Sequence, residues 1–294
     1  MRPMQLRRSW LFVGAADKDA ILTSYDSGAD VCIQEFEDFC VPELRREARL
    51  MMPDILSDWR ARKIVATVRI NPLEDPDGLR DLDAAIHAGA DAILLPKANT
   101  KEQINLLQKH INDIGKHHGK SASITAIIPN IEQARGLMNI TDVLSSSPQI
   151  AGALVASEDM AVSLNAPRQQ NSEILNHVRS MFHIACCSVG ITSIDMPYTF
   201  TDDEGVRQQT ILAKDIGMVA KSTVNPSHCA IINEILTPNE REVENAAQMI
   251  SAFENGRDSG KGQVIFNGTK IEIPTYLNAK QIVERSKSLF DYGS

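Results

Sequence analysis

Residues 89–97 read GADAILLPK, and this stretch has the features of one repeating structural unit. Its glycine suits the left-handed conformation that ends many helices, and the apolar run 92–95 suits a short strand buried on both faces. The same Gly-Ala-Asp order precedes the apolar run 31–35, and Gly217 precedes the run 218–224. A helix that ends at glycine and re-enters a buried strand is typical of parallel β/α units.

Outward from this stretch, similar apolar runs recur at intervals that leave room for one helix between them. The eight runs are 9–13, 31–35, 64–70, 92–95, 124–128, 153–156, 191–194 and 218–224. Helix-start signals lie between them at Asp17, at Thr100 with Gln103 as a capping box, and at Ser172. Eight units predict an α/β fold, a closed (β/α)8 TIM barrel over residues 1–236.

Residues 237–294 follow the eighth unit and predict an extension to the barrel. A helix is expected from 237–239 to 255–256, followed by a hairpin over 263–272 and a last helix. The hairpin prediction depends on Asn267-Gly268, because Asn-Gly is the strongest two-residue turn signal. We expect this C-terminal helix–hairpin–helix extension to pack on the barrel or on a neighbouring subunit.

Composition excludes several classes of protein. The 294 residues carry a net charge of −8 with no cluster of Lys and Arg, which argues against nucleic acid or an anionic membrane as a partner. No apolar run is long enough to span a bilayer, and the run after the first eight residues is too short for a signal peptide. Five cysteines without paired spacing predict reduced thiols. We therefore expect a cytoplasmic protein.

Charged and polar side chains follow the predicted strands, where barrel enzymes place their catalytic groups. In chain order they are Glu35, Glu37, Asp38, Arg69, Asn71, Lys97, Glu132, Glu158, Asp159, Asp195 and Asn225. Carboxylates gathered at one rim would repel one another unless a cation lay among them. Oxygen ligands without His or Cys select a hard ion such as Mg²⁺, which usually takes one or two protein carboxylates. Glu132 and Asp159, on adjacent strands, are the natural metal-binding pair.

Arg69 is expected to point toward the same rim, where its guanidinium suits a two-pronged grip on a substrate carboxylate. Each residue also has a simpler explanation. A single acid after a strand is more often a helix cap or a surface group, and Arg69 alone is equally well explained as an ion-pair partner. Structural ion pairs are the favoured explanation for Lys97 and Lys221, and a capping or surface position for His228. The occurrence of all these charged residues after the strands favours a functional site over the separate simpler explanations.

Several segments match the motifs of a known family. They are RSWLFV at 8–13, EFED at 35–38, RIN at 69–71, LPK at 95–97, IPNIEQARG at 128–136, SED at 157–159, and FE at 253–254 with the hairpin glycine at 268. Over nearly its whole length the chain resembles the citrate lyase β-subunit group within the HpcH/HpaI aldolase and citrate lyase superfamily.

The resemblance implies roles for individual residues. Glu132 and Asp159 would bind Mg²⁺, and Arg69 would hold the keto-acid part of the substrate. Glu272 would act as acid/base from a neighbouring subunit. Glu37 and Asp38 are the next candidates for the base. Arg8, Asn71 and Lys97 are expected to contribute to substrate binding with Arg69, and the assembly is expected to be a homotrimer or a larger homo-oligomer.

Four positions depart from the family pattern. Glu35 stands where the family usually has Asp, and Ala156 where it has Gly. Asn225 replaces the His of an I-H-P segment, and Glu272 replaces the Asp of many stand-alone members. These differences leave the identity of the base open and predict a narrower or altered substrate range.

The reaction that the resemblance implies is a retro-Claisen cleavage. A Mg²⁺-dependent carbon–carbon lyase would split a 3-hydroxyacyl-CoA thioester into acetyl-CoA and a 2-keto acid. Citramalyl-, citryl- and malyl-CoA are the candidate substrates. Citramalyl-CoA or a close relative is favoured, because the chain resembles a stand-alone homologue and not a member of a carrier-protein complex.

Two rival functions stay open at this point. A Schiff-base aldolase would use Lys97 or Lys221 as a desolvated nucleophile and would need no metal. A non-catalytic barrel that binds an acyl thioester or a carrier protein would explain the four departures.

Overall fold

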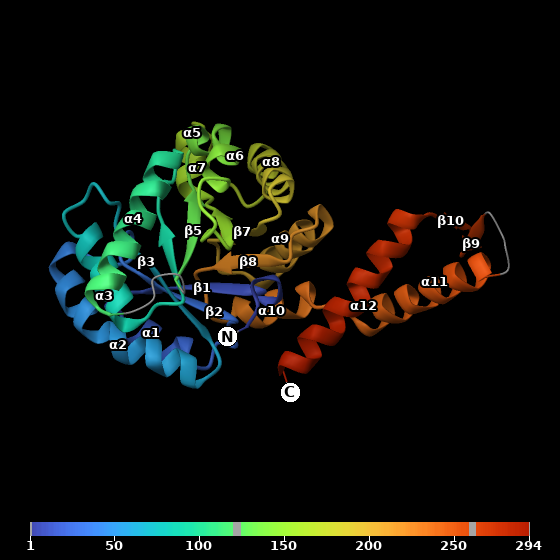
Figure 1. The fold of residues 1–294 in the computed structure, drawn as a ribbon, viewed down its shortest axis with the longest axis horizontal. Helices are drawn as coiled ribbons and strands as arrows, with labels where there is room; N and C mark the ends of the chain where they lie inside the picture. The colour runs from blue at the N-terminus through green and yellow to red at the C-terminus, as the bar shows by residue number, and fades with distance from the viewer. Residues whose placement is uncertain (1, 120–124, 259–262, 294) are drawn as a thin grey trace. The chain divides into compact units, whose positions relative to one another are not determined.

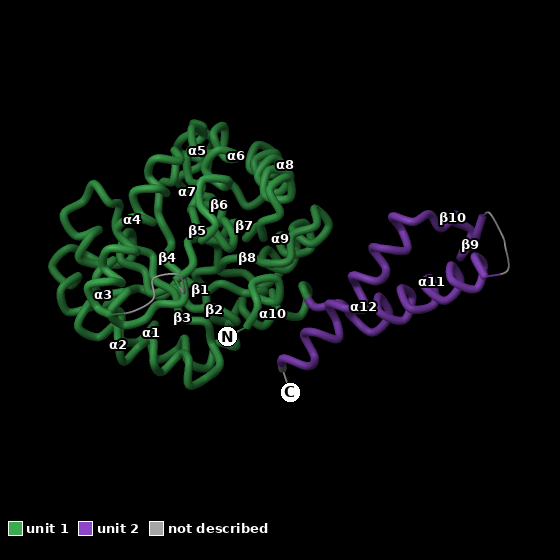
Figure 2. The backbone as a smooth tube through the Cα atoms, viewed as in Figure 1, with its two compact units in different colours: residues 1–236 green, residues 237–294 purple. Residues whose placement is uncertain are grey.

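A computed structural model of the chain describes residues 2–119, 125–258 and 263–293. The chain divides into two compact units, residues 1–236 and residues 237–294 (Figure 2).

The first unit contains a closed barrel of eight strands within the described residues, in the order β1 to β8. All eight neighbouring pairs are parallel. The strands are β1 Ser9–Gly14, β2 Val31–Glu35, β3 Val65–Arg69, β4 Ala92–Leu95, β5 Ala126–Ile131, β6 Gly152–Val155, β7 Thr192–Tyr198 and β8 Ala220–Thr223. The predicted (β/α)8 fold is confirmed.

Helices surround the barrel on its outer side (Figure 1). They are α1 Lys18–Ser24, α2 Arg45–Ala61, α3 Gly78–Ala88, α4 Lys101–His117, α5 Ala134–Met138, α6 Ile140–Leu144, α7 Glu158–Ser163, α8 Glu173–Ser188, α9 Asp203–Ile216 and α10 His228–Leu236, with 3-10 turns at Met4–Leu6 and Pro42–Leu44. The predicted start signals are confirmed, because the side chains of Asp17 and Ser172 cap α1 and α8 and Thr100 forms a capping box.

Strand side chains alternate between the barrel interior and the layer beneath the helices. Trp10, Ile33 and Leu94 belong to the apolar cluster inside the barrel. Val68 and Ile131 belong to the larger cluster between strands and helices. This alternation decides which side chains at the strand ends face inward.

Six strands differ from the predicted ranges, and two of them, β5 and β7, extend three or more residues beyond the predicted end. The predicted fifth strand begins at Ile124, which lies outside the described residues, and β5 extends to Ile131. The predicted seventh strand ends at residue 194, whereas β7 continues to Tyr198. The Asp195 carboxylate is neutralised by buried cations, so the strand continues through this polar residue.

The second unit pairs two helices and a hairpin, as the sequence predicts. It comprises α11 Glu240–Asp258, β9 Val264–Phe266, β10 Thr269–Ile271 and α12 Ile273–Gly293. Strands β9 and β10 are antiparallel. Asn267 and Gly268 between them both have positive φ, 47° and 75°, as a two-residue type I′ turn requires. Phe253 of α11 stacks on Tyr276 of α12 with ring centroids 4.6 Å apart.

Every helix among the described residues is too short or too polar to cross a lipid bilayer.

Candidate active site

A cavity of about 330 Å³ opens at the carboxyl ends of the barrel strands. Phe12, Leu154 and Val224 form much of its apolar wall. Arg69 and Asp159 supply charged groups to the same cavity. Its position is the one at which enzymes with this fold carry out their chemistry, so the cavity is the candidate active site.

Arg69, the last residue of β3, lies at the centre of a cluster of carboxylates. Its Nε donates to Glu35 Oε1 at 2.7 Å, and its Nη1 donates to Glu132 Oε1 at 3.1 Å. Its Nη2 lies 2.5 Å from Asp38 Oδ2 and 3.3 Å from Glu37 Oε2. Burial lowers the pKa of Arg69, but the four acids outweigh burial and raise it overall, so the guanidinium stays charged.

Glu35 positions both Arg69 and the loop that follows β2. It is fully buried and is the register partner of Arg69 across β2 and β3. Its carboxylate also accepts hydrogen bonds from the backbone N–H groups of Glu37, at 2.7 Å, and Phe39, at 2.5 Å. The departure from Asp to Glu at this position therefore supplies a side chain that bridges β3 and the segment that carries Asp38.

Glu132 follows β5 and is almost fully buried. Its Oε1 accepts from Arg69 and from Asn130 Nδ2, and its Oε2 accepts from the backbone N–H of Lys97 at 3.2 Å. Burial raises the pKa of Glu132 to about 7 although Arg69 lowers it, and the charges of Glu37 and Asp159 raise it further. The ionised form of Glu132 would be favoured by additional positive charge close by.

The carboxylates of Glu132 and Asp159 suit a magnesium ion in their negative charge and in offering only oxygen ligands. Asp159 lies in the first turn of α7, lines the cavity, and acts electrostatically on Glu132. Within the described ranges, no group of three or more His, Cys, Asp or Glu side chains is arranged to hold a metal ion. A pair of carboxylates is nonetheless the usual protein share of a Mg²⁺ site, because the ion keeps positions for water and substrate.

Lys97 supports this arrangement through both its backbone and its side chain. Its φ of 49° is unusual for a residue other than glycine, and its N–H points to Glu132. Its Nζ donates a hydrogen bond to Glu37 Oε1. Burial lowers the pKa of Lys97, but the bond to Glu37 outweighs burial and raises it overall, so Lys97 is a cation and not a free amine nucleophile.

Of the four expected substrate-binding residues, Arg69 lines the cavity, whereas Arg8, Asn71 and Lys97 do not. Arg8 precedes β1 and therefore lies at the opposite end of the strands, where its Nε donates to Asp30 Oδ2 at 2.9 Å. Asn71 is buried, and its Nδ2 donates to Phe36 O at 3.1 Å and to Asp81 Oδ2 at 2.7 Å. Both side chains hold parts of the barrel together.

Asp195 does not join the carboxylates around Arg69. Its Oδ1 accepts from Arg179 Nε of α8 at 2.8 Å, and its Oδ2 accepts from Lys221 Nζ at 2.6 Å. The contact with α8 places this triad between the strands and the helices, so the prediction that every acid after a strand shares one rim is wrong for Asp195. His228 is also buried, which excludes the surface position, and its Nε2 lies 3.3 Å from Asn225 Nδ2.

Lys221 has the wrong surroundings for a Schiff base. Its side chain has no exposed surface, and its Nζ also donates to Met196 O at 2.6 Å. Burial lowers the pKa of Lys221 to about 8 in spite of Asp195, which leaves the amine mostly protonated at neutral pH. The geometry of Lys97 and Lys221 therefore gives no support to the Schiff-base aldolase.

Lys221→Met should destabilise the barrel without removing a catalytic group. The substitution leaves Asp195 with Arg179 as its remaining cation, and breaking a buried ion pair typically costs about 3–5 kcal/mol. Chemical denaturation should show a loss of this size, and the exposed Lys109→Met should show almost none. Equal stability of Lys221→Met and the wild type would contradict a supporting role for the triad.

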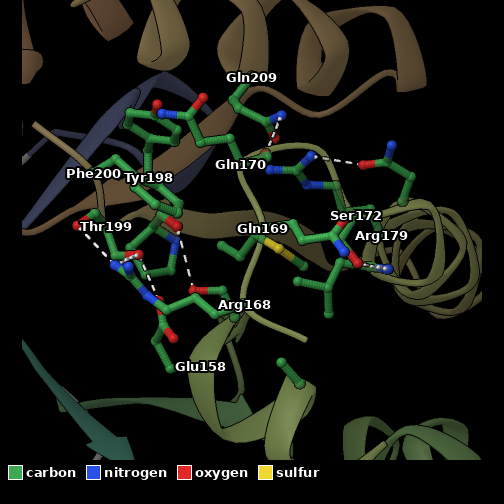
Figure 3. A pocket seen from close by; sticks show the side chains of 16 residues that line it. Glu158, Arg168, Gln169, Gln170, Ser172, Arg179, Tyr198, Thr199, Phe200 and Gln209 are labelled. Atoms are coloured by element: carbon green, nitrogen blue, oxygen red, sulfur yellow. Dashed lines mark hydrogen bonds and ion pairs between the residues drawn. The ribbon is translucent and has the colours of Figure 1, made fainter. Parts of the chain in front are cut away.

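A second, smaller pocket lies beside the active-site cavity (Figure 3). The Arg168 guanidinium stacks on Phe200 at 4.2 Å from the ring centroid, and its Nε donates to Glu158 Oε1 at 3.1 Å. Thr199 Oγ1 donates to the same carboxylate at 2.5 Å. The free space is about 40 Å³, which suits one or two water molecules and not a thioester. These residues fix the loop after β7 at the edge of the main cavity.

Glu272 lies in the second unit, directly before α12. Its side chain is 63% exposed, and its carboxylate lies 3.4 Å from Lys270 Nζ. The first unit therefore brings together Arg69, Glu37, Asp38, Glu132 and Asp159 with Lys97 beside them, whereas the base expected from the resemblance belongs to the other unit.

Sequence reasoning missed Asn130, which lines the cavity with its side chain fully buried. The strand pattern of the sequence contains a signal that could have identified it. Ile128 faces the barrel interior, so strand alternation places the side chain of residue 130 on the same side. A polar side chain at an interior position directly before Glu132 is itself an indication of a site.

Comparison with known proteins gives one family. Residues 8–226 match the family model described as HpcH/HpaI aldolase/citrate lyase. The citrate lyase subunit beta of Leuconostoc mesenteroides subsp. cremoris is 28% identical over 287 residues, covering 97% of this chain and 94% of that protein. The L-malyl-CoA/beta-methylmalyl-CoA lyase of Rhodobacter capsulatus is 27% identical over 309 residues, covering 97% of this chain and 96% of that protein.

Two solved structures share the fold. CitE from Mycobacterium tuberculosis, in complex with magnesium, acetoacetate and coenzyme A, superposes with a TM-score of 0.78 at 22% identity, covering 95% of this chain and 98% of that one. RipC from Yersinia pestis superposes with a TM-score of 0.67 at 28% identity, covering 81% of this chain and 99% of that one.

Proposed function

The chain belongs to the HpcH/HpaI aldolase/citrate lyase family, and from this membership we propose that it is a Mg²⁺-dependent carbon–carbon lyase acting on a 3-hydroxyacyl-CoA thioester. The products would be acetyl-CoA and a 2-keto acid. One observation carries the proposal: Arg69, Glu132 and Asp159 meet at the carboxyl ends of the strands in a chain whose relatives include citrate lyase subunits and malyl-CoA lyases.

Glu132 and Asp159 would hold the metal. When bound, Mg²⁺ supplies a Lewis acid and a template for the oxygen atoms of the substrate. The cation would also offset the negative charge that Glu37 and Asp159 impose on Glu132. The oxygen-only donor set is the type that Mg²⁺ prefers.

Arg69 would bind the carboxylate that leaves with the keto acid. Its Nε and Nη1 contact the buried Glu35 and Glu132, whereas its Nη2 contacts Asp38, whose side chain is 47% exposed. A substrate carboxylate would most readily replace Asp38 on Nη2, since the exposed acid regains solvent when it is displaced. In this proposal Asp38 lies at the entrance of the site and moves aside when the substrate binds.

The reaction then requires a base and one bond cleavage. The base takes the proton of the 3-hydroxyl group, the bond between C2 and C3 breaks, and the hydroxyl-bearing carbon becomes the carbonyl of the keto acid. The electron pair of the broken bond forms the enolate of the thioester, and protonation at C2 yields the acetyl thioester. Glu37 is bound to Lys97 and Arg69, and Asp38 is bound to Arg69. The base that we favour is Glu272 of a neighbouring subunit, which is the role that the family resemblance implies.

Glu272→Gln should lower turnover by roughly 10²-fold or more, the usual scale for loss of a general base, with little change in Mg²⁺ affinity. The exposed Glu284→Gln of the same unit serves as the control. Mixed oligomers of Glu272→Gln and Asp159→Asn should regain activity that neither variant has alone, because one subunit keeps the base and its neighbour keeps the metal ligand. Near-normal turnover of Glu272→Gln would remove the residue from the mechanism.

A panel of citramalyl-, citryl- and malyl-CoA tests the substrate assignment. Release of pyruvate, oxaloacetate or glyoxylate identifies the thioester, and we favour citramalyl-CoA or a close relative. The homotrimeric or larger assembly and the cytoplasmic location belong to the same proposal, and sedimentation analysis tests the first. Borohydride inactivation in the presence of substrate would instead indicate a Schiff base.

A further inference from the structure

Asn130 has an unusual environment for a buried amide. It lies on β5, is the register partner of Leu154, and has no exposed surface. Its side chain lines the candidate active site beside Phe12, Leu154 and Val224, which supply no hydrogen-bond donors from their side chains. A buried polar group in such surroundings costs free energy unless it finds a partner.

The Asn130 amide has a hydrogen-bond partner for its nitrogen but not for its oxygen. Nδ2 donates to Glu132 Oε1 at 3.2 Å, and this contact fixes the orientation of the amide, because the opposite orientation would place Oδ1 against a carboxylate. Among the described residues that line the cavity, Asn130 Oδ1 is the one buried side-chain nitrogen or oxygen atom without a hydrogen-bond partner. The structure thus leaves an acceptor in the cavity wall next to a proposed metal ligand.

Arg69, which donates to the same Glu132 oxygen as Asn130, does not serve this acceptor. The Arg69 guanidinium directs its Nε, Nη1 and Nη2 at Glu35, Glu132 and Asp38. No described side chain donates to Asn130 Oδ1, so its donor is an O–H group from solvent or from a ligand. Mg²⁺ usually keeps water molecules in its coordination shell, and the substrate of the proposed reaction carries a hydroxyl group, so both sources offer the same O–H chemistry.

We propose that Asn130 is a positioning residue for the metal site: its Nδ2 orients Glu132, and its Oδ1 accepts a hydrogen bond from the O–H group of a metal-bound water or of the substrate. The inference rests on the proposed function and deepens it. Groups that orient metal ligands in this way commonly change metal affinity by roughly 10- to 100-fold when they are removed.

The test compares the wild type with Asn130→Leu, which keeps a similar volume and removes both polar atoms. Titration calorimetry with MgCl₂ alone should show affinity that is roughly 10- to 100-fold weaker for the variant if the O–H group is a coordinated water. Asn105→Leu, the same change at an exposed site on α4, should bind Mg²⁺ like the wild type. Asn130→Ala replaces Asn130→Leu if the thermal transition shows that the leucine variant is unfolded.

A second arm identifies the other source of the O–H group. If Mg²⁺ affinity is unchanged but KM for the hydroxyacyl-CoA rises about tenfold or more, with unchanged affinity for the keto acid, Asn130 accepts from the substrate hydroxyl. Folded variants that match the wild type in Mg²⁺ affinity and in KM would overturn the inference and leave the proposed lyase intact. A wild type that binds no Mg²⁺ would overturn both.

Discussion

Asp159→Asn is expected to lower turnover by roughly 10³-fold, because it removes one of the two carboxylates proposed to hold Mg²⁺ and with it several kcal/mol of charge stabilisation. Glu132→Gln should have the same effect, since we propose that both residues hold the same ion. Titration calorimetry should show Mg²⁺ binding weakened by at least 10²-fold in each variant. Neither substitution changes side-chain volume appreciably, so the barrel should remain folded.

Asp142→Asn is the matched control, because Asp142 is an exposed acid in the first turn of α6. It should keep wild-type Mg²⁺ affinity and turnover. Circular dichroism should give the same spectrum for all the variants. If Asp159→Asn bound Mg²⁺ as tightly as the control, the metal would have to be held elsewhere and the proposed site would be abandoned.

Arg69→Lys should weaken keto-acid binding by roughly 10- to 100-fold. Lysine keeps the charge but loses the planar group that meets several acids at once, and one hydrogen bond to a charged partner contributes about 1.5–3 kcal/mol. The affinity for pyruvate or oxaloacetate in the presence of Mg²⁺ measures the change directly.

Two further variants separate binding from stability at Arg69. Arg207→Lys, a residue of α9 paired with the exposed Glu234, should leave keto-acid affinity unchanged. Arg69→Met should also lower stability by about 3–5 kcal/mol, since it leaves the buried Glu35 and Glu132 without the cation that both contact. Unchanged keto-acid affinity in Arg69→Lys would reduce Arg69 to a structural ion-pair partner.

The sequence predicted the barrel and the grouping of residues at its carboxyl rim, because both depend on the order of the strands. Apolar runs of four to seven residues define a barrel because strands buried on both faces have little room for polar side chains. Arg69, Glu132 and Asp159 end up together because each lies at or just after the carboxyl end of a strand, and parallel strands bring these ends to one side of the barrel. No knowledge of side-chain contacts was needed for that step.

The parts that failed depend on side-chain direction and on charge balance. Asp195 is in a strand but faces the helix layer, where Arg179 and Lys221 neutralise it. Arg8 was expected in the site because it belongs to a family motif, although it precedes its strand and so lies at the far end. Lys97 has a positive φ and a hydrogen bond to Glu37, and composition and periodicity reveal neither.

The most direct test of the central claim is the dependence of thioester cleavage on Mg²⁺. The metal-free protein, prepared with EDTA, is incubated with citramalyl-, citryl- or malyl-CoA while the free keto acid is followed, and MgCl₂ is then added. The account predicts no keto acid before the addition and steady release afterwards from at least one thioester. Equal release with and without the metal, or no release from any of the three, would contradict it.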